Sequence, residues 1–247
     1  MAFWGKTRLR EGKVCSYPLV AHALDVAAVG LCLPPPANSM PPSMLGFLLA
    51  LHDLGKFSRP FQAQVPSLWP EPVLGPWPGR LSGPRHDALT AVLLEQFARE
   101  GRLDGVLPPG RRGQGWSFNQ RAGLIRTIAG HHGRPVDVPD HAGAALGPQC
   151  ESAARDFLSA MLKLFQPPAC PPPQGGHANA QMQWRLAGFL TIADWIGSNE
   201  IWFPLEGTGD DLDPVDYFER LALPRARAAV AAAGITPAEA RSVIGFS

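Results

Sequence analysis

Proline-rich segments interrupt this chain of 247 residues at intervals that leave room for helices between them. The main interruptions are residues 34–42, 66–84, 108–115 and 167–176. Proline lacks the backbone N–H that a helix interior needs, so each cluster ends one element before the next begins. With 27 prolines and 26 glycines, the chain exceeds ordinary usage of both residues. The sequence therefore predicts compact elements joined by long, stiff loops.

The segments between the interruptions have the apolar periodicity of helices. No alternation with a period of two is sustained, and no internal repeat occurs. We expect helices over residues 18–33, 41–55, 57–64, 87–101, 117–130, 151–165, 178–199, 213–223 and 226–234. The segment 41–55 is apolar on every face, which predicts a central position. The predicted fold class is all-α: a helical bundle with long Pro/Gly-rich loops in a single domain over residues 1–247.

The composition of the chain excludes several classes of protein. The 22 Lys and Arg nearly balance the 21 Asp and Glu, which excludes a protein that coats nucleic acid through charge alone. No apolar stretch approaches the roughly 20 residues that a membrane helix needs, and the N-terminus lacks the apolar region of a signal peptide. The four cysteines form no CxxC pair. We therefore expect a reducing, cytoplasmic location and no membrane partner.

Seven possible metal ligands fall at the ends or on the apolar faces of the predicted helices. They are His22, His52, Asp53, His86, His131, His132 and Asp194. One histidine on an apolar face is more often a core residue bonded to a backbone carbonyl, but five of the seven histidines belong to this set. A buried carboxylate such as Asp53 also needs a compensating cation. Because imidazole and carboxylate bind divalent transition metals, the pattern predicts two metals bridged by one carboxylate.

The order of these residues resembles the HD superfamily of metal-dependent phosphohydrolases. It resembles more closely the HD nuclease domain of the CRISPR-associated helicase-nuclease of type I systems. The matching motifs are FWGKT near the start, HALDV with His22, HDLGKF at 52–57, RH at 85–86, AGHHG at 129–133 and ADWIGSN at 193–199. The HHG and ADWxxSN segments are the specific ones, since other HD proteins share only the HD pair and scattered ligands.

The resemblance implies a role for each matched residue. One metal would be held by His22, His52, Asp53 and Asp194, and a second by Asp53, His86, His131 and His132. Asp53 would bridge the two ions, which would be iron, manganese, cobalt or nickel rather than magnesium. Lys56 would act with Asp53 in catalysis, although it could equally be a solvated lysine at a helix end. Ser198 and Asn199 would contact substrate, although they could equally end the helix.

The implied activity is cleavage of single-stranded DNA in CRISPR interference, as an endonuclease or exonuclease in which two metals activate the attacking water. The implied partners are a helicase domain or subunit and an RNA-guided surveillance complex. The chain would be a separate nuclease or the N-terminal part of a longer helicase-nuclease. One alternative is an HD phosphohydrolase acting on nucleotides or cyclic dinucleotides. A second is a catalytically silent scaffold with a structural metal site.

Three further features of the sequence lead to separate expectations. Asp25 lies three residues after His22 and could orient its imidazole. Arginines between 99 and 126, together with Trp116 and Phe118, could form a track for single-stranded DNA, or simply solvated helix ends. The GKT at 5–7 resembles the end of a phosphate-binding loop, but the earlier glycine and the strand before it have no room, so no ATP site is expected.

Overall fold

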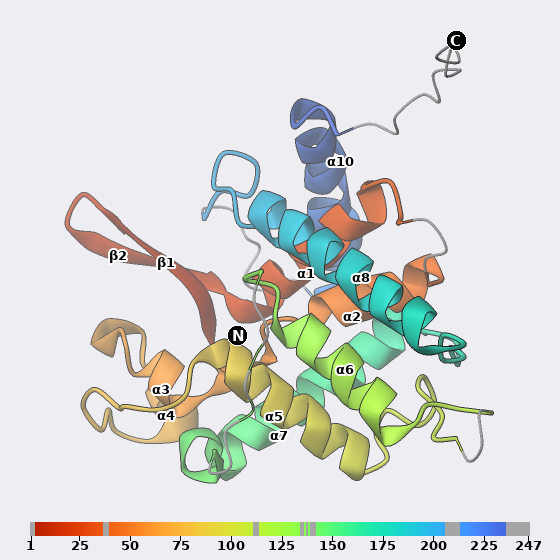
Figure 1. The fold of residues 1–247 in the computed structure, drawn as a ribbon. Helices are drawn as coiled ribbons and strands as arrows, with labels where there is room; N and C mark the ends of the chain where they lie inside the picture. The colour runs from red at the N-terminus through yellow and green to blue at the C-terminus, as the bar shows by residue number, and fades with distance from the viewer. Residues whose placement is uncertain are drawn as a thin grey trace.

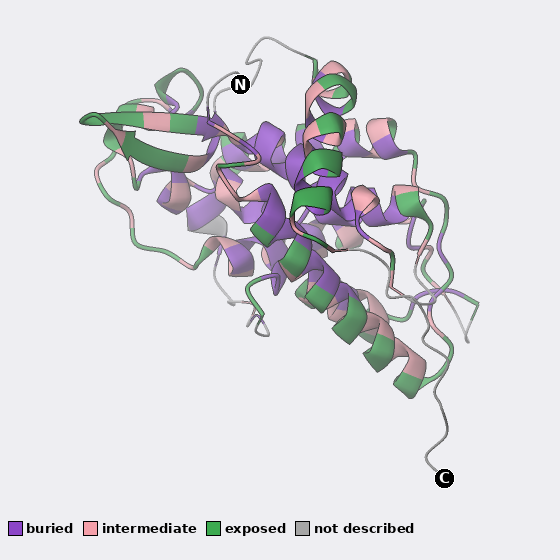
Figure 2. Ribbon diagram, turned by 90° about the horizontal axis from the view of Figure 1, so that it is seen from above, coloured by how far each residue is buried: buried purple, intermediate pink, exposed green. Residues whose placement is uncertain are grey.

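The computed structural model describes residues 3–36, 40–110, 114–133, 136, 138, 142–205 and 213–235. Helix α1 (Leu19–Cys32) is the central element, and α2 (Pro42–Ala50), α8 (Gly176–Gly197) and α10 (Leu223–Ala232) pack around it (Figure 1). Nearly all of α1 is buried, and its alanines allow the neighbouring helices to come close. Figure 2 shows the buried residues gathered where these helices meet. The predicted central position of the 41–55 segment is confirmed by the complete burial of α2 from Met44 onward.

The remaining long helices cover one side of this centre. Helix α6 (Phe118–Ala129) lies between α5 (His86–Arg99) and α8, while α7 (Gly143–Phe165) packs on α2 and on the 3-10 helix η1 (Leu54–Phe57). Short elements fill the connections: α3 (Arg59–Gln62), η2 (Pro66–Leu68), α4 (Glu71–Leu74), α9 (Pro214–Tyr217) and the π-helical turn η3 (Phe218–Ala222). The predicted fold class, all-α, is thus confirmed. None of the helices in the described ranges is long and apolar enough to cross a membrane.

A β-hairpin at the N-terminus was not predicted. Strand β1 (Trp4–Arg10) pairs antiparallel with β2 (Lys13–Pro18) through a two-residue turn at Glu11 and Gly12, which have φ angles of 48° and 77°. Both faces of the outer hairpin are exposed, so Leu9 and Val14 point into solvent and no apolar alternation marks the strands (Figure 2). Gly12 was the sequence signal for this turn, since glycine takes the positive φ that such hairpins require without steric cost.

Several predicted helix boundaries also differ from the structure, most of all those of α2 and α7. Helix α2 ends at Ala50 instead of continuing to Gly55, so His52 and Asp53 lie in the turn before η1 rather than in a last helical turn. Asp53 has φ −111° and ψ 20°, outside helical geometry. Helix α7 begins at Gly143, before the predicted 151, and is kinked at Gly147, whose φ of 70° and ψ of 160° are not helical.

Candidate metal centre

The carboxylate of Asp53 lies at the centre of a cluster of imidazoles. Its Oδ2 atom is 3.0 Å from Nε2 of His22 and 3.2 Å from Nε2 of His52. Its Oδ1 atom is 3.4 Å from Nε2 of both His86 and His131. The two oxygens of one buried carboxylate therefore face two different pairs of imidazoles. One pair comes from α1 and the turn after α2, and the other from α5 and the turn after α6.

Asp194 and His132 complete the cluster. Oδ1 of Asp194, on α8, is 3.7 Å from Nε2 of both His22 and His52. Nε2 of His132 is 3.1 Å from Nε2 of His86. Three groups of ligand atoms each fit within 4.8 Å: His22, His52 and Asp53; His86, His131 and His132; and His52, His131 and Asp194. The structure thus brings together all seven of the predicted ligands.

Backbone carbonyls orient two of these imidazoles toward the centre of the cluster. The Nδ1 atom of His52 lies 2.7 Å from the Leu49 carbonyl oxygen, and that of His131 lies 3.4 Å from the Ile128 carbonyl oxygen. A carbonyl can only accept, so each Nδ1 carries a proton, and in the neutral imidazole Nε2 keeps a free lone pair. This is the arrangement in which histidine binds a metal.

Two of the ligand atoms that face the centre of the cluster make no hydrogen bond of normal geometry within the described part of the chain. They are Nε2 of His52 and Oδ1 of Asp53, and both are buried. Buried polar atoms without partners are rare, because each costs desolvation free energy that nothing offsets. Imidazole nitrogens with carboxylate oxygens form a donor set suited to divalent transition metals. The residues present therefore fit the metals that the sequence motifs imply.

The electrostatics of the site favour ionised carboxylates next to mostly neutral imidazoles. Burial would raise the pKa of Asp53, but Lys56 and His52 hold it well below its usual value. Burial lowers the pKa of His86 and of His131 to about 4. Burial would also lower the pKa of His52, yet the carboxylates of Asp53 and Asp194 raise it to about 9. His52 therefore takes up a proton where two buried carboxylates require a cation.

Lys56 contacts the cluster directly. Its Nζ atom lies 2.6 Å from Oδ2 of Asp53 and donates a hydrogen bond of 3.1 Å to the carbonyl of Gly5. The side chain is only 12% exposed. This burial contradicts the alternative interpretation of Lys56 as a solvated lysine at a helix end.

Ser198 and Asn199 follow Asp194 at the end of α8. The Ser198 hydroxyl donates a 2.8 Å hydrogen bond to Oδ1 of Asp194, and so contacts a member of the cluster. The Asn199 side chain accepts from the backbone N–H of Ile201 at 2.9 Å, which stabilises the turn that ends the helix. Contact of either residue with substrate stays a prediction.

A close approach of backbones that was not predicted brings His86 to the cluster. A Cβ atom added to Gly55 would lie 1.8 Å from the His86 carbonyl oxygen, so η1 and the start of α5 can meet only at a glycine. The Gly55 N–H donates to the Thr90 hydroxyl at 2.8 Å. Thr191 in turn donates to the carbonyl of His131 at 2.8 Å and ties α8 to the end of α6. Gly55 stands in the HDLGK motif, which was the only sequence signal for this role.

Asp25 does not orient His22. Its carboxylate accepts hydrogen bonds from the hydroxyls of Tyr17, at 2.5 Å, and Tyr217, at 2.9 Å, behind the cluster. Burial raises the pKa of Asp25 to about 7. Nδ1 of His22 makes no hydrogen bond to any described residue. The expectation that Asp25 would act on His22 is therefore wrong, since the two tyrosines occupy its oxygens.

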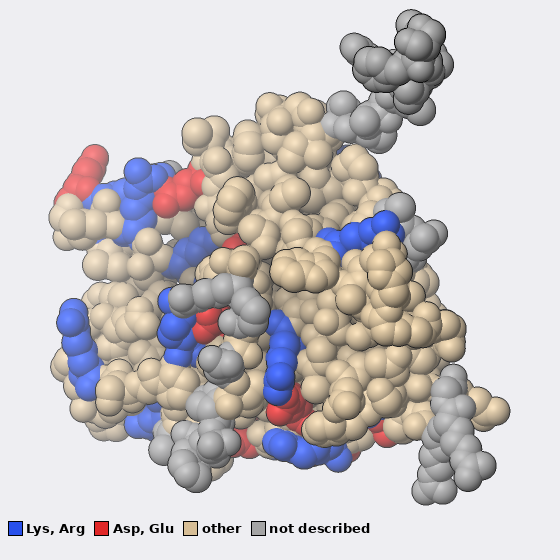
Figure 3. All heavy atoms as spheres, in the orientation of Figure 1, with Lys and Arg blue, Asp and Glu red and all other residues tan. Residues whose placement is uncertain are grey.

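The possible arginine track loses one of its two aromatic residues, whereas the other, Phe118, is 80% exposed. Trp116 is buried, and its indole N–H donates to the carbonyl of Cys170 at 2.6 Å, so its ring cannot stack on a base. Arg121 pairs with Asp104 at 2.7 Å. Arg111 and Arg112 lie outside the described residues. Figure 3 shows basic side chains scattered among acidic ones on this face, with no continuous basic stripe.

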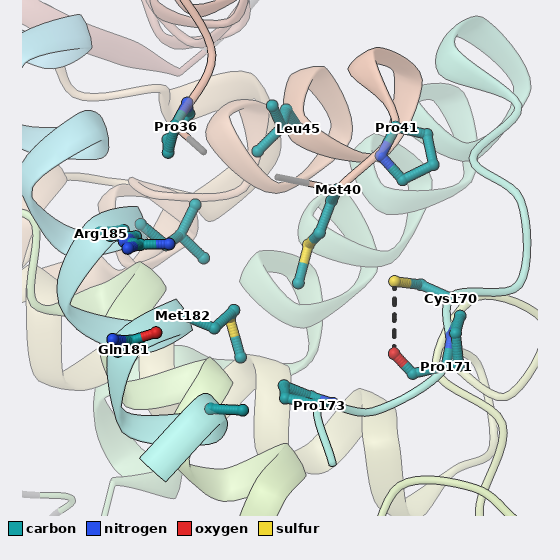
Figure 4. A pocket seen from close by; sticks show the side chains of 12 residues that line it. Pro36, Met40, Pro41, Leu45, Cys170, Pro171, Pro173, Gln181, Met182 and Arg185 are labelled. Carbon is teal, nitrogen blue, oxygen red and sulfur yellow. Dashed lines mark hydrogen bonds between the residues drawn. The ribbon is translucent and has the colours of Figure 1, made fainter. Parts of the chain in front are cut away.

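A separate apolar pocket of about 420 Å³ lies between the start of α2, the segment before α8 and α8 itself (Figure 4). Met40, Leu45, Met182 and Leu186 line it, together with several prolines and the polar Gln181 and Arg185. None of the seven clustered residues contributes to this pocket. Its lining lacks the nitrogen and oxygen donors of a metal centre, so the two sites are distinct.

Comparisons with known proteins place the chain among HD domains. A family model described as "Cas3, HD domain" matches residues 4–203. The chain is 28% identical over 215 residues to the CRISPR-associated endonuclease/helicase Cas3 of Thermus thermophilus, covering 76% of this chain and 21% of that protein. It therefore spans about a fifth of the length of this curated relative.

Two solved structures resemble the fold closely. The crystal structure of the Thermus thermophilus Cas3 HD domain in the presence of Ni²⁺ is 26% identical with a TM-score of 0.61, and the match covers 92% of this chain and 88% of that one. A chain from a CRISPR RNA-guided surveillance complex, described as pre-nicking, is 26% identical with a TM-score of 0.68, covering 94% of this chain and 29% of that chain.

Proposed function

Since its residues 4–203 match the family model, this chain belongs to the family of Cas3 HD domains, and from that premise we propose that it is a metal-dependent nuclease that cleaves single-stranded DNA. The observation that carries the proposal is the position of Asp53, whose two oxygens face two separate groups of imidazoles. A single carboxylate placed in this way can bridge two cations. The name of the relative, an endonuclease/helicase, supports a polymer as the substrate.

The two groups define which residues would hold each cation. His22, His52, Asp194 and Oδ2 of Asp53 would hold one; His86, His131, His132 and Oδ1 of Asp53 would hold the other. When bound, such ions polarise a phosphodiester and lower the pKa of bound water. Histidine-rich donor sets favour iron, manganese, cobalt or nickel over magnesium, which prefers oxygen ligands.

The chain's own residues prepare the site for an anionic substrate. Lys56 keeps the Asp53 carboxylate ionised, and its ammonium retains one N–H that can bind a phosphate oxygen. Ser198 holds Oδ1 of Asp194 in place. The Leu49 and Ile128 carbonyls hold the Nδ1 protons of His52 and His131, so that Nε2 is the atom of each ring that faces the cluster.

The surface favours a single strand over a duplex. The net charge is only +1, and the visible basic residues are dispersed (Figure 3). Holding and bending a duplex needs many phosphate contacts, whereas a flexible single strand can reach a recessed cluster with few.

Exposed apolar residues on the outer face of α8 and in the loop after it are consistent with a helicase partner. Trp184 and Trp195 are 78% and 71% exposed, and Ile201 is 86% exposed. Arg185 and Asp194 are the only charged residues of the helix, and Asp194 is turned inward. Exposed aromatics with so few charges beside them are typical of protein interfaces. We propose that a helicase, on the same chain or another, covers this face and that an RNA-guided complex recruits the pair.

The test is cleavage by the metal-stripped chain reloaded with manganese. We expect a labelled single strand to be cut and a blunt duplex of the same sequence to be spared. Hydrolysis of nucleoside monophosphates or cyclic dinucleotides, with both polymers left intact, would select the nucleotide phosphohydrolase instead. Stoichiometric metal binding with no hydrolysis of any of these would select the silent scaffold.

A further inference from the structure

The first residues of β1 contact two of the segments that carry clustered residues. The Lys6 ammonium donates a 2.8 Å hydrogen bond to the carbonyl of Gly197, the last residue of α8 and three positions after Asp194. The neighbouring Gly5 carbonyl accepts the hydrogen bond from Lys56, whose ammonium contacts Asp53. Two adjacent residues of one strand are thus bonded to both sides of the cluster.

The start of β1 is also held tightly against α1 and η1. A Cβ atom on Gly5 would lie 2.9 Å from Cα of Leu19 and 3.4 Å from Cβ of His22, so the strand runs directly over the helix at that histidine. The Gln62 side-chain amide donates to the carbonyls of Trp4, at 2.9 Å, and Lys56, at 2.8 Å, and accepts from the Trp4 N–H. A strand fixed at this point cannot shift relative to His22.

Lys6 supplies a charge that α8 itself lacks. The last carbonyls of a helix have no partner within the helix, and a cation near them is favourable. The last turn of α8 contains no basic residue. The Lys6 ammonium takes this place from the hairpin, half-buried, with its Nζ atom 5.4 Å from the centroid of the Tyr17 ring.

We infer that Lys6 is a positioning residue of the metal centre, whose ammonium anchors the end of α8 to the hairpin and thereby keeps the Asp194 carboxylate in the cluster. The inference rests on the proposed function, because the position of the Asp194 carboxylate matters in this way only if the cluster binds cations. It also gives the GKT segment a role that involves no ATP. Lys6 acts through Asp194 and need not touch the substrate.

The test is a calorimetric titration of the metal-free 247-residue chain with Ni²⁺ alone. Lys6→Met removes the ammonium but keeps the length of the side chain, and we expect its affinity for the ion held with Asp194 to fall by about 10-fold or more, as for other residues that orient ligands. Lys6→Arg keeps the cation and should restore most of the affinity. Lys13→Met, an exposed lysine of the same hairpin, is the matched control and should bind like the wild type.

Thermal unfolding of each metal-free variant separates positioning from general stability. We expect Lys6→Met to melt near the wild type while binding Ni²⁺ more weakly. If that variant does not fold, Lys6→Gln, which keeps a polar head group, takes its place. Equal Ni²⁺ affinity for the wild type and the neutral variants would overturn the inference and leave the nuclease proposal intact. Absence of Ni²⁺ binding by the wild type would overturn both.

Discussion

The ammonium of Lys56 lies 2.6 Å from Oδ2 of Asp53, the same oxygen that faces His22 and His52. The carboxylate is therefore paired with a cation of its own chain on one side and faces His86 and His131 through its other oxygen. Because both Lys56 and Asp53 are largely withdrawn from water, their interaction is screened far less than a surface ion pair.

Lys56→Met should reduce cleavage of single-stranded DNA by about 100-fold, since it removes a preorganised donor from a buried site. Lys163→Met changes an exposed lysine of α7 and is the control. The measurement is the single-turnover cleavage rate at saturating manganese. An unchanged rate in Lys56→Met would show that Lys56 has no part in the reaction.

Metal selectivity should follow the donor set. Manganese, cobalt, nickel or ferrous iron should each restore cleavage to the metal-stripped chain, because imidazole nitrogens suit these ions. Magnesium alone should restore little, and calcium none. Full activity with magnesium alone would be incompatible with a centre to which five histidines contribute.

Asp25 should make the stability of the metal-free protein depend on pH. Burial raises its pKa to about 7 in the folded chain, against about 3.9 in an unfolded one. At a pH between these two pKa values, Asp25 of the folded protein holds a proton that Asp25 of the unfolded chain has lost. This contribution to stability is present in full below pH 4 and is lost as the pH rises through 7.

Asp25→Asn removes this titration. Between pH 5 and pH 8 the wild type should lose about 3 kcal/mol of unfolding free energy relative to the variant. Urea denaturation at the two pH values measures the difference, and the comparison cancels all groups that titrate alike in both proteins. A difference that is the same at both pH values would exclude the raised pKa.

The positions of the main helices and the identity of the possible metal ligands were predictable, because both depend on local sequence patterns. Apolar periodicity located α1, α5 and α8, and the HD, HHG and ADW motifs identified side chains that meet only in the fold. The hairpin was missed since exposed residues such as Leu9 and Val14 leave no periodic signal. Asp25 was assigned to the wrong partner because its tyrosines lie 8 and 192 positions away along the chain.

Contacts between distant segments could not be predicted from a single sequence for the same reason. The bond from Lys6 to Gly197 joins residues 191 positions apart, and no spacing rule relates them. Trp116 was assigned to a surface track from its place in a Gly-rich loop, yet the segment around Cys170 folds over it and buries its ring.

The most direct test of the account is single-strand cleavage by metal-stripped protein reloaded with manganese, comparing the wild type with Asp53→Asn. Asparagine keeps the shape of the side chain but removes the charge that both groups of ligands share. The wild type should cleave only after reloading, and Asp53→Asn should remain folded by circular dichroism and cleave at no detectable rate. Cleavage by Asp53→Asn at the wild-type rate, or by the wild type without metal, would contradict the account.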